Sequence, residues 1–326
     1  MTPPAETRGV AEAALQWVSE QRIGFALDEH VLDAATDVNR TWKPLGELAQ
    51  VCVCVCRHTP PGTSLHRAAS DLLAFAWEQT RDGALFVDLQ RLEPWASYPL
   101  EIYAAFASAG LRHHGYERFV STIARTRGWR LLELLPNRRL GVLNSERRSG
   151  LPPHAEPAEE LARTWLGGLP EPWTFEQGAG YTLTHVVFHL TDWGRAVDRV
   201  PPHVASYVET WLPPWLDTCL EDEQWDLSCE LLAIAASLPR PPDPAVVEAG
   251  WAAVAGAQEE HGALPEMGPG RHGRPVPRDF LHCYHSTLMA AYAGALTLAR
   301  VGPDGARHAG PGGAREAASV EQGAAP

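Results

Sequence analysis

The sequence predicts an all-α protein made of paired antiparallel helices, and three observations lead to this prediction. Apolar residues recur every three or four positions along most of the 326 residues, which is the spacing of one helix face. Proline and glycine gather between these segments, as in HTPPGTS and LPRPPDP, where they end one helix and let the next begin. The alternation typical of strands is confined to VCVCVC at residues 51–56.

The expected helices follow one another with short connections. They occupy residues 11–20, 28–38, 44–54, 66–79, 99–111, 157–169, 180–194, 202–212, 226–238, 244–256 and 278–300. The VCVCVC run is assigned to a helix because Leu45, Leu48, Cys52 and Val55 keep helical spacing through it. Roughly eleven helices joined by short turns favour αα-hairpins, up to about six and arranged as an α/α toroid, over a four-helix bundle.

The domain organisation follows from where Gly, Pro and polar residues concentrate. Residues 1–301 are expected to form a single helical domain. The Gly- and Pro-rich segment at residues 144–160 is the expected hinge between an N-terminal and a C-terminal half. Residues 302–326 hold almost no large apolar side chain, so a disordered tail is expected there.

Composition excludes several classes of partner. The net charge is −13 and no basic cluster stands out, so a nucleic-acid partner is not expected. No stretch resembles a signal peptide, and no apolar run reaches the roughly 18 residues that cross a bilayer, which predicts a cytoplasmic protein without a membrane partner. Six cysteines in a chain of this length are too few for a disulfide scaffold and are expected to be thiols.

The segment RDFLHCYHSTLMAAYAGALTLAR at residues 278–300 carries two histidines on an apolar helix face. His282, His285, Met289 and Tyr292 advance by three and four residues, so they share that face. The imidazoles are therefore expected to point into the interior or into a cavity.

A second polar group lies in YTLTHVVFHLTDWG, where Tyr181, His185, His189 and Asp192 fall on one helical face. Two histidines four residues apart are a familiar metal pair. The zincin pattern, however, needs a glutamate directly after the first histidine, where Val186 stands, so a metalloprotease is disfavoured. The structural alternative is a core histidine at 185, fixed by Asp192 or by a backbone carbonyl.

Acidic residues gather in the segment at residues 217–230. Asp226 and Glu230 lie one helical turn apart at the start of an apolar helix, where capping and the helix macrodipole offer an explanation without chemistry. A magnesium–diphosphate site is the other interpretation. It is disfavoured because EDEQWD departs from the D-D-x-x-D pattern of terpene synthases.

Two short pieces resemble protein prenyltransferase β chains: RDFLH at residues 278–282 and DTC at residues 217–219. This resemblance implies an α/α toroid in which Asp217, Cys219 and His282 bind a zinc ion that activates a thiolate. The chain departs from that family because it lacks glycine-rich repeats and basic residues for a diphosphate. It also lacks the D-x-D-D motif of toroidal terpene cyclases, whereas Cys283 beside a histidine is similar to lanthionine cyclases.

As a whole, the chain resembles all-helical actinobacterial proteins encoded near natural-product pathways, through Y-x-L-T-H, T-D-W-G and C-Y-H-S-T-L. The expected function is that of a small-molecule biosynthetic enzyme, a lyase or cyclase or a hydrolase, that uses acid–base chemistry in a central cavity. The expected acid–base residues are Tyr181, His185, Asp192, Asp226 and His285. The expected substrate contacts are Trp193, Glu230, Tyr284 and Tyr292. The alternative is a non-catalytic helical scaffold that binds a peptide or protein partner.

Overall fold

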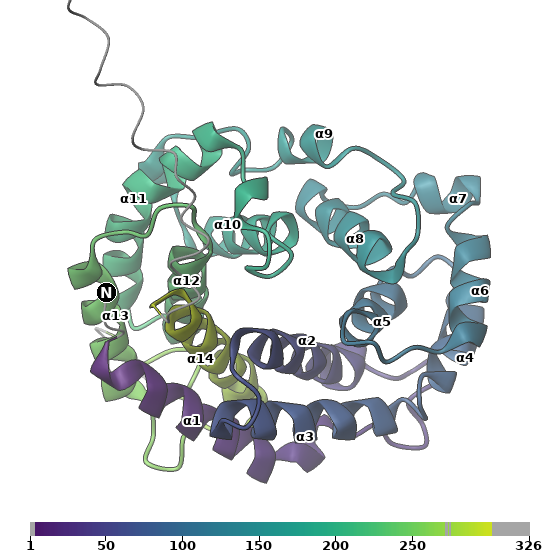
Figure 1. The fold of residues 1–326 in the computed structure, drawn as a ribbon, viewed down its shortest axis with the longest axis horizontal. Helices are drawn as coiled ribbons and strands as arrows, with labels where there is room; N and C mark the ends of the chain where they lie inside the picture. The colour runs from purple at the N-terminus through teal and green to yellow at the C-terminus, as the bar shows by residue number, and fades with distance from the viewer. Residues whose placement is uncertain (1–3, 271–272, 274, 302–326) are drawn as a thin grey trace, which may run out of the picture.

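The computed structural model describes residues 4–270, 273 and 275–301, and the chain is all-helical within them (Figure 1). These ranges contain fourteen α-helices, four short 3-10 helices and no strand. The prediction of an all-α fold is confirmed. No helix of the described part is long and apolar enough to cross a membrane. The expected tail at residues 302–326 lies outside the described residues.

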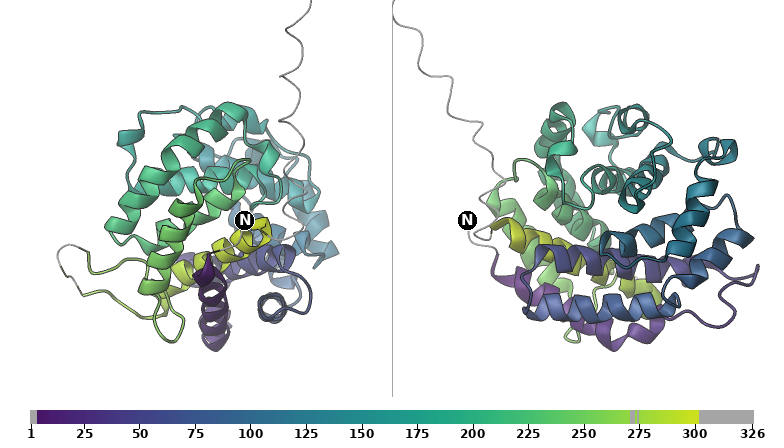
Figure 2. Two further views of the ribbon diagram at one scale, coloured as in Figure 1. Left: turned by 60° about the vertical axis from the view of Figure 1, so that its left-hand side comes forward. Right: turned by 45° about the vertical axis from the view of Figure 1, so that its right-hand side comes forward.

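Six helices contact one another in a closed order, each packing against the next and the last against the first. They are α2 (Trp42–His58), α5 (Tyr98–Ser108), α8 (Pro136–Ser149), α10 (Gln177–Leu190), α12 (Trp225–Ser237) and α14 (Phe280–Val301). In Figure 1 these six inner helices surround the middle of the molecule, and the views in Figure 2 show the same arrangement from two other sides.

The other eight helices lie outside this ring. They are α1 (Ala5–Glu20), α3 (Ser64–Gln79), α4 (Ala84–Leu92), α6 (His114–Ile123), α7 (Arg127–Arg130), α9 (Pro157–Leu161), α11 (Pro202–Glu221) and α13 (Pro244–Ala257). The outer α3 covers α2, α11 and α13 cover α12, and α1 covers α14. Inner and outer helices therefore alternate along most of the chain. The 3-10 helices are Arg22–Phe25, Val38–Arg40, Pro172–Thr174 and Val197–Arg199.

The inner helix α2 shows why the VCVCVC run is helical. Leu45, Leu48, Cys52 and Val55 are fully buried, and so are Val51 and Cys54 on other sides of the same helix. A helix that is apolar around most of its circumference is one enclosed by neighbours. Because α2 lies between α3, α5 and α14, its valines and cysteines fill the core, and the helix prediction for this run is confirmed.

The structure departs from the expected elements in three places. Residues 28–38 form turns instead of a helix, because local bonds such as Asp28 Oδ1 accepting from the His30 N–H compete with helical bonding. The sequence pattern missed α4, α6, α7 and α8. Residues 144–149, expected to open a hinge, form the last turns of α8, and the connecting loop that follows is anchored to them. In that loop the backbone N–H of His154 donates to buried Glu146 Oε2 at 3.1 Å.

Candidate functional site

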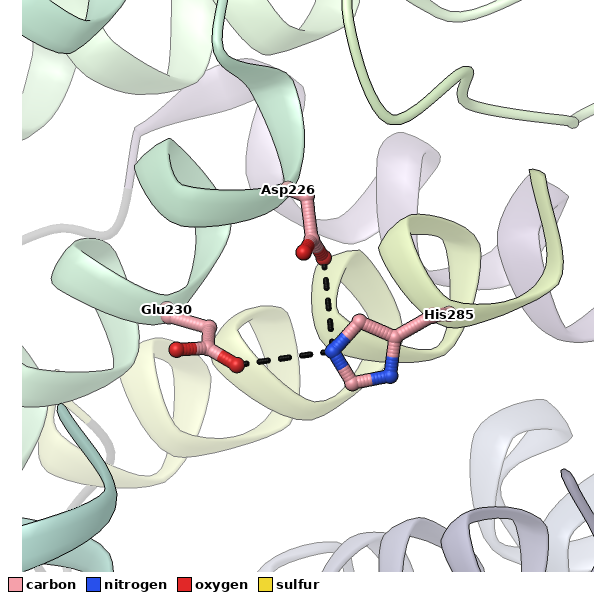
Figure 3. A group of neighbouring side chains, drawn as sticks. All are labelled: Asp226, Glu230 and His285. Carbon is pink, nitrogen blue, oxygen red and sulfur yellow. Dashed lines mark ion pairs between the residues drawn. The ribbon is translucent and has the colours of Figure 1, made fainter. Parts of the chain in front are cut away.

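The His285 imidazole of α14 lies among carboxylates from two other inner helices. Its Nδ1 is 3.1 Å from Oε2 of Glu47 on α2. Its Nε2 is 3.5 Å from Asp226 Oδ1 and also 3.5 Å from Glu230 Oε1, both on α12 (Figure 3). We refer to Glu47, Asp226, Glu230 and His285 as the His285 group. The two ring nitrogens thus face different carboxylates.

The helix α10 orients the two carboxylates of α12. The Tyr181 hydroxyl donates to Asp226 Oδ2 at 2.8 Å, and the Thr184 hydroxyl donates to Glu230 Oε2. The outer oxygen of each carboxylate is thereby bonded. The inner oxygens, Asp226 Oδ1 and Glu230 Oε1, have no hydrogen-bond partner among the described residues, and both point at the imidazole.

Local sequence spacing produces this convergence. Asp226 and Glu230 are four residues apart on α12, and Tyr181 and His185 are four apart on α10, so each pair shares a helix face. A backbone bridge also joins the starts of α12 and α14, because Glu266 accepts from the Asp226 N–H and donates to the His282 carbonyl. Capping does not explain Asp226, because the N-cap of α12 is Gln224 and the Asp226 side chain bonds Tyr181.

Electrostatics within the group favour a charged His285. Burial acts to lower the pKa of His285, but the Asp226 and Glu47 charges outweigh it and raise the pKa well above its usual value. Burial acts to raise the pKa of Glu230 and of Glu47, yet contacts with His285 leave both pKa values lowered. Burial raises the pKa of Asp226 to about 7, against the opposing charge of His285.

Exposure of the side chains indicates how the group meets solvent. Asp226 and Glu230 are 5% and 1% exposed, whereas His285 is 16% exposed. The His185 side chain of α10, whose Nε2 is 3.8 Å from Glu230 Oε1, is 39% exposed. Desolvation lowers the pKa of His185, and the Glu230 charge opposes this effect. The carboxylates therefore lie at the base of the site, with His185 on its solvent side.

The two remaining inner helices, α5 and α8, bring further charges toward α10. Arg138 of α8 donates to Glu101 of α5 at 2.8 Å. A Cβ added at Gly141 of α8 would lie 3.0 Å from Nε2 of His189 and 3.3 Å from Glu101 Oε2, so α8 and α10 approach closely here. Each of the six inner helices therefore contributes at least one of the ionisable residues named in this subsection.

Asp192 does not join the His285 group, and its expected acid–base role is corrected. The expectation required α10 to continue past residue 192, but the helix ends at Leu190, and Asp192 and Trp193 have φ angles of 52° and 58°. This left-handed turn carries the Asp192 side chain to arginines instead. Its Oδ1 is 3.3 Å from Arg147 and 3.6 Å from Arg148, and it is buried.

The residues expected to bind zinc are not brought together. Asp217 and Cys219 lie on the outer helix α11 two positions apart, so Asp217 is exposed while Cys219 is buried. Burial raises the pKa of the Cys219 thiol to about 12, which disfavours the thiolate that zinc needs. His282 is exposed and contacts Asp279 at 2.9 Å. Among the described residues, the one group of His, Cys, Asp or Glu placed to share a cation is Asp226, Glu230 and His285.

The expected substrate contacts fall in different places. Glu230 belongs to the His285 group, and Tyr284 is buried beside Phe25 and Phe280. Tyr292 is fully buried and packs edge-on against Trp193 at 5.6 Å between ring centroids, so it lies in the core, and its role as a substrate contact stays a prediction. Trp193 is only partly buried but stacks on Phe188 at 4.9 Å, as a packed aromatic does.

Sequence patterns missed two residues that complete the site. The periodic pattern places Glu47 in an apolar helical stretch and Thr184 at an ordinary helix position, and it marks neither as a site residue. The available signal for Glu47 was its position as the one acidic residue in PLGELAQVCVCVC, because a carboxylate inside a buried helix needs a partner.

Comparison with known proteins places the chain in a family. The sequence model described as Domain of unknown function (DUF6895) matches residues 11–295. The chain belongs to the DUF6895 family. The matched DUF6895 region contains the whole His285 group and all six inner helices up to residue 295. No match was found among curated proteins or among solved structures.

Proposed function

We propose that the protein is an enzyme that moves protons on a small-molecule substrate at the His285 group. The proposed class is a lyase or cyclase of natural-product biosynthesis, and the proposed architecture is an α/α toroid whose ring of inner helices encloses the reaction. One observation supports this most strongly. A single imidazole contacts carboxylates from two other helices, at a place where the neighbouring His185 side chain is partly exposed to solvent.

The arrangement suggests a division of roles. His185 is the proposed group that exchanges a proton with substrate, because it lies on the solvent side and has Glu230 behind it at 3.8 Å. His285 and Asp226 are the proposed second pair, with Tyr181 holding the Asp226 carboxylate in place at 2.8 Å. An imidazole backed by a carboxylate keeps one orientation and one tautomer, and general acid–base catalysis requires both.

A non-catalytic scaffold is the weaker alternative. Burying carboxylates around one imidazole has a desolvation cost that a surface used only for docking has no need to bear. A scaffold that binds a protein partner would place its recognition residues on exposed surface, whereas Asp226 and Glu230 are almost fully buried. The buried group is therefore better suited to chemistry.

The test is turnover of a compound by the purified protein. The small-molecule fraction of cells lacking this gene is incubated with the protein, and mass spectrometry follows which compound disappears and which one forms. His185→Gln and His285→Gln are expected to slow this conversion by about 100-fold or more, the usual contribution of a general acid or base. His282→Gln is the matched control, because His282 is exposed on the same helix as His285.

The proposal fails if no compound is converted by the folded protein. It also fails if His185→Gln and His285→Gln convert the compound as fast as His282→Gln does.

A further inference from the structure

We propose that Asp226, Glu230 and His285 bind one divalent transition-metal ion through Oδ1, Oε1 and Nε2. The inference deepens the proposed function and rests on it only for the use to which the ion is put. With an ion bound, His285 and Asp226 hold the ion instead of transferring a proton, and His185 remains the proton-transfer group. Binding itself is a separate property and is measured without a substrate.

The distances around Nε2 fit a shared ion better than a direct hydrogen bond. A charged imidazole that bonds a carboxylate directly does so at about 2.7–2.9 Å. Nε2 instead lies 3.5 Å from both Asp226 Oδ1 and Glu230 Oε1. Two ligand atoms bound at about 2.1 Å in a tetrahedron are about 3.4 Å apart. The three ligand atoms all lie within 4.8 Å of one another, the arrangement of a group that could hold one ion.

Unpartnered oxygens point to the same place. Asp226 Oδ1 and Glu230 Oε1 are buried, and neither has a hydrogen-bond partner among the described residues. Buried carboxylate oxygens without partners are rare because desolvation is then uncompensated. Tyr181 and Thr184 bond the other oxygen of each carboxylate, which turns the unpartnered pair toward Nε2. Such hydrogen bonds behind a ligand are typical of metal sites.

Glu47 completes this arrangement from the opposite side of the ring of His285. A histidine that binds a metal through one nitrogen usually donates from the other to a carboxylate or carbonyl. Nδ1 of His285 lies 3.1 Å from Glu47 Oε2, so Nε2 is the nitrogen left to face the ion. Lys43 is also near, with its Nζ 3.9 Å from Glu47 Oε1. With a neutral imidazole, the two positive charges of a divalent ion and the one of Lys43 would together balance the negative charges of the three carboxylates.

The donor atoms indicate the class of ion. One imidazole nitrogen with two carboxylate oxygens suits Mn²⁺, Fe²⁺ or Zn²⁺, whereas Mg²⁺ and Ca²⁺ prefer oxygen ligands alone. Three protein ligands leave coordination positions open for water or substrate. The solvent-side His185 lies next to Glu230, so an open position would be close to the proposed proton-transfer group.

The experiment measures metal binding by the full chain. The protein is stripped with a chelator, reloaded separately with Zn²⁺, Mn²⁺ or Mg²⁺, desalted and analysed for metal content. About one equivalent of Zn²⁺ or Mn²⁺ is expected to remain, with far less Mg²⁺. Saturating metal is expected to raise the melting temperature by about 5 °C. Asp226→Asn, Glu230→Gln and His285→Gln should each lose most of the bound metal, and His282→Gln should retain it.

Two measurements keep the result interpretable. Far-UV circular dichroism shows whether each variant folds, and Asp226→Asn still offers an oxygen to the Tyr181 hydroxyl. Glu47→Gln touches no ligand atom of the ion, and it is expected to weaken metal affinity by about 10- to 100-fold without abolishing binding. Folded ligand variants that bind as much metal as the unsubstituted chain overturn the inference, as does a folded unsubstituted chain that retains none of these ions. Turnover by a chain that retains none of these ions on reloading would overturn this inference and leave the proposed function standing. Metal binding without turnover would overturn the proposed function and leave this inference standing.

Discussion

Glu47 and His285 are 238 positions apart in the chain, yet Oε2 of the first lies 3.1 Å from Nδ1 of the second. The contact joins α2 to α14, the two inner helices whose packing closes the ring. It therefore ties the N-terminal part of the chain to its last described helix through a charged pair. Removing it should affect the stability of the whole ring.

The first prediction concerns this pair. Glu47→Ala is expected to lower the free energy of unfolding by about 1.5–3 kcal/mol, the usual contribution of a hydrogen bond to a charged group. Urea denaturation followed by circular dichroism measures the change. The control is Glu29→Ala, because Glu29 pairs with His30 in solvent and should contribute under about 0.5 kcal/mol. Equal losses in the two variants would show that the Glu47 contact does not hold the ring.

The second prediction concerns the ion pair between Asp192 and Arg148, which lies at the C-terminal ends of α5, α8 and α10. Arg148 is nearly fully buried, bonds Gln50 of α2 and Ser108 of α5, and faces Asp192 at 3.6 Å. Arg148→Met should lower the free energy of unfolding by about 3–5 kcal/mol, because it removes the one buried arginine that faces Asp192 and leaves that buried charge to the more exposed Arg147 and Arg195. Arg195→Met is the control, since Arg195 is 60% exposed and also contacts Asp192.

A double variant separates charge from packing in this pair. If the loss of buried pairing for the Asp192 charge destabilises the variant, Arg148→Met combined with Asp192→Asn should recover part of the stability that Arg148→Met removes. A double variant as unstable as the sum of both single variants would contradict that cause. Denaturant unfolding of the four proteins gives the comparison.

The sequence revealed the helical class and most of the site because both depend on local periodicity. Asp226 and Glu230 share a face of α12, and Tyr181 and His185 share a face of α10, at spacings that any helix must respect. Residue types at those spacings therefore identified the polar residues that meet His285. In the segment C-Y-H-S-T-L, the Ser286 hydroxyl donates to the Leu264 carbonyl and the Thr287 hydroxyl accepts from the Leu264 N–H, and these contacts are not part of the periodic pattern.

The sequence misplaced or missed residues whose position depends on where a helix ends or on contacts with distant parts of the chain. Asp192 was placed on the His185 face because nothing local shows that α10 stops at Leu190. The hinge at residues 144–160 stays a prediction, but the pattern did not show that residues 144–149 are helical, because α8 is polar and its buried Glu146 bonds Trp129 and His154 from outside the helix. Glu47 was missed because its partner is 238 residues away. Such contacts leave no periodic trace in a single sequence.

The third prediction is a loss of stability in acid that depends on His189. Desolvation, the His185 charge and the arginines 138 and 148 lower the pKa of His189 well below its usual value. The unfolded chain, with an imidazole pKa of about 6.5, then binds more protons than the folded chain as the pH falls. The stability due to His189 is therefore present above pH 6.5 and declines below it, by at most about 1.4 kcal/mol per pH unit.

Urea unfolding at about pH 7.5 and about pH 5.5 tests this prediction. His189→Gln should show a smaller difference in unfolding free energy between the two pH values than the unsubstituted chain. His203→Gln is the control, because His203 is exposed on α11 and should leave the difference unchanged. An unchanged difference in His189→Gln would mean that acid sensitivity comes from other groups.

The last prediction concerns the close approach of α1 and α14. At Gly294 of α14, an added Cβ would lie 2.8 Å from the Cβ of Ala11 and 3.4 Å from the carbonyl oxygen of Thr7, both on α1. Gly294→Ala must therefore push the two helices apart, and it is expected to lower the free energy of unfolding by about 1–3 kcal/mol, as overpacking of a core does. Thermal unfolding measures the change.

A glycine on the facing helix provides the control. Gly9 lies inside α1 with nothing within 4 Å of an added Cβ, so Gly9→Ala gains helix propensity without a clash. It should raise the free energy of unfolding by about 0.5–1 kcal/mol. Changes of opposite sign in the free energy of unfolding for Gly294→Ala and Gly9→Ala would establish the α1–α14 contact, because helix propensity alone predicts that both substitutions stabilise. If Gly294→Ala were also stabilising, the two helices would have to be farther apart than described, and the covering of α14 by α1 would be wrong.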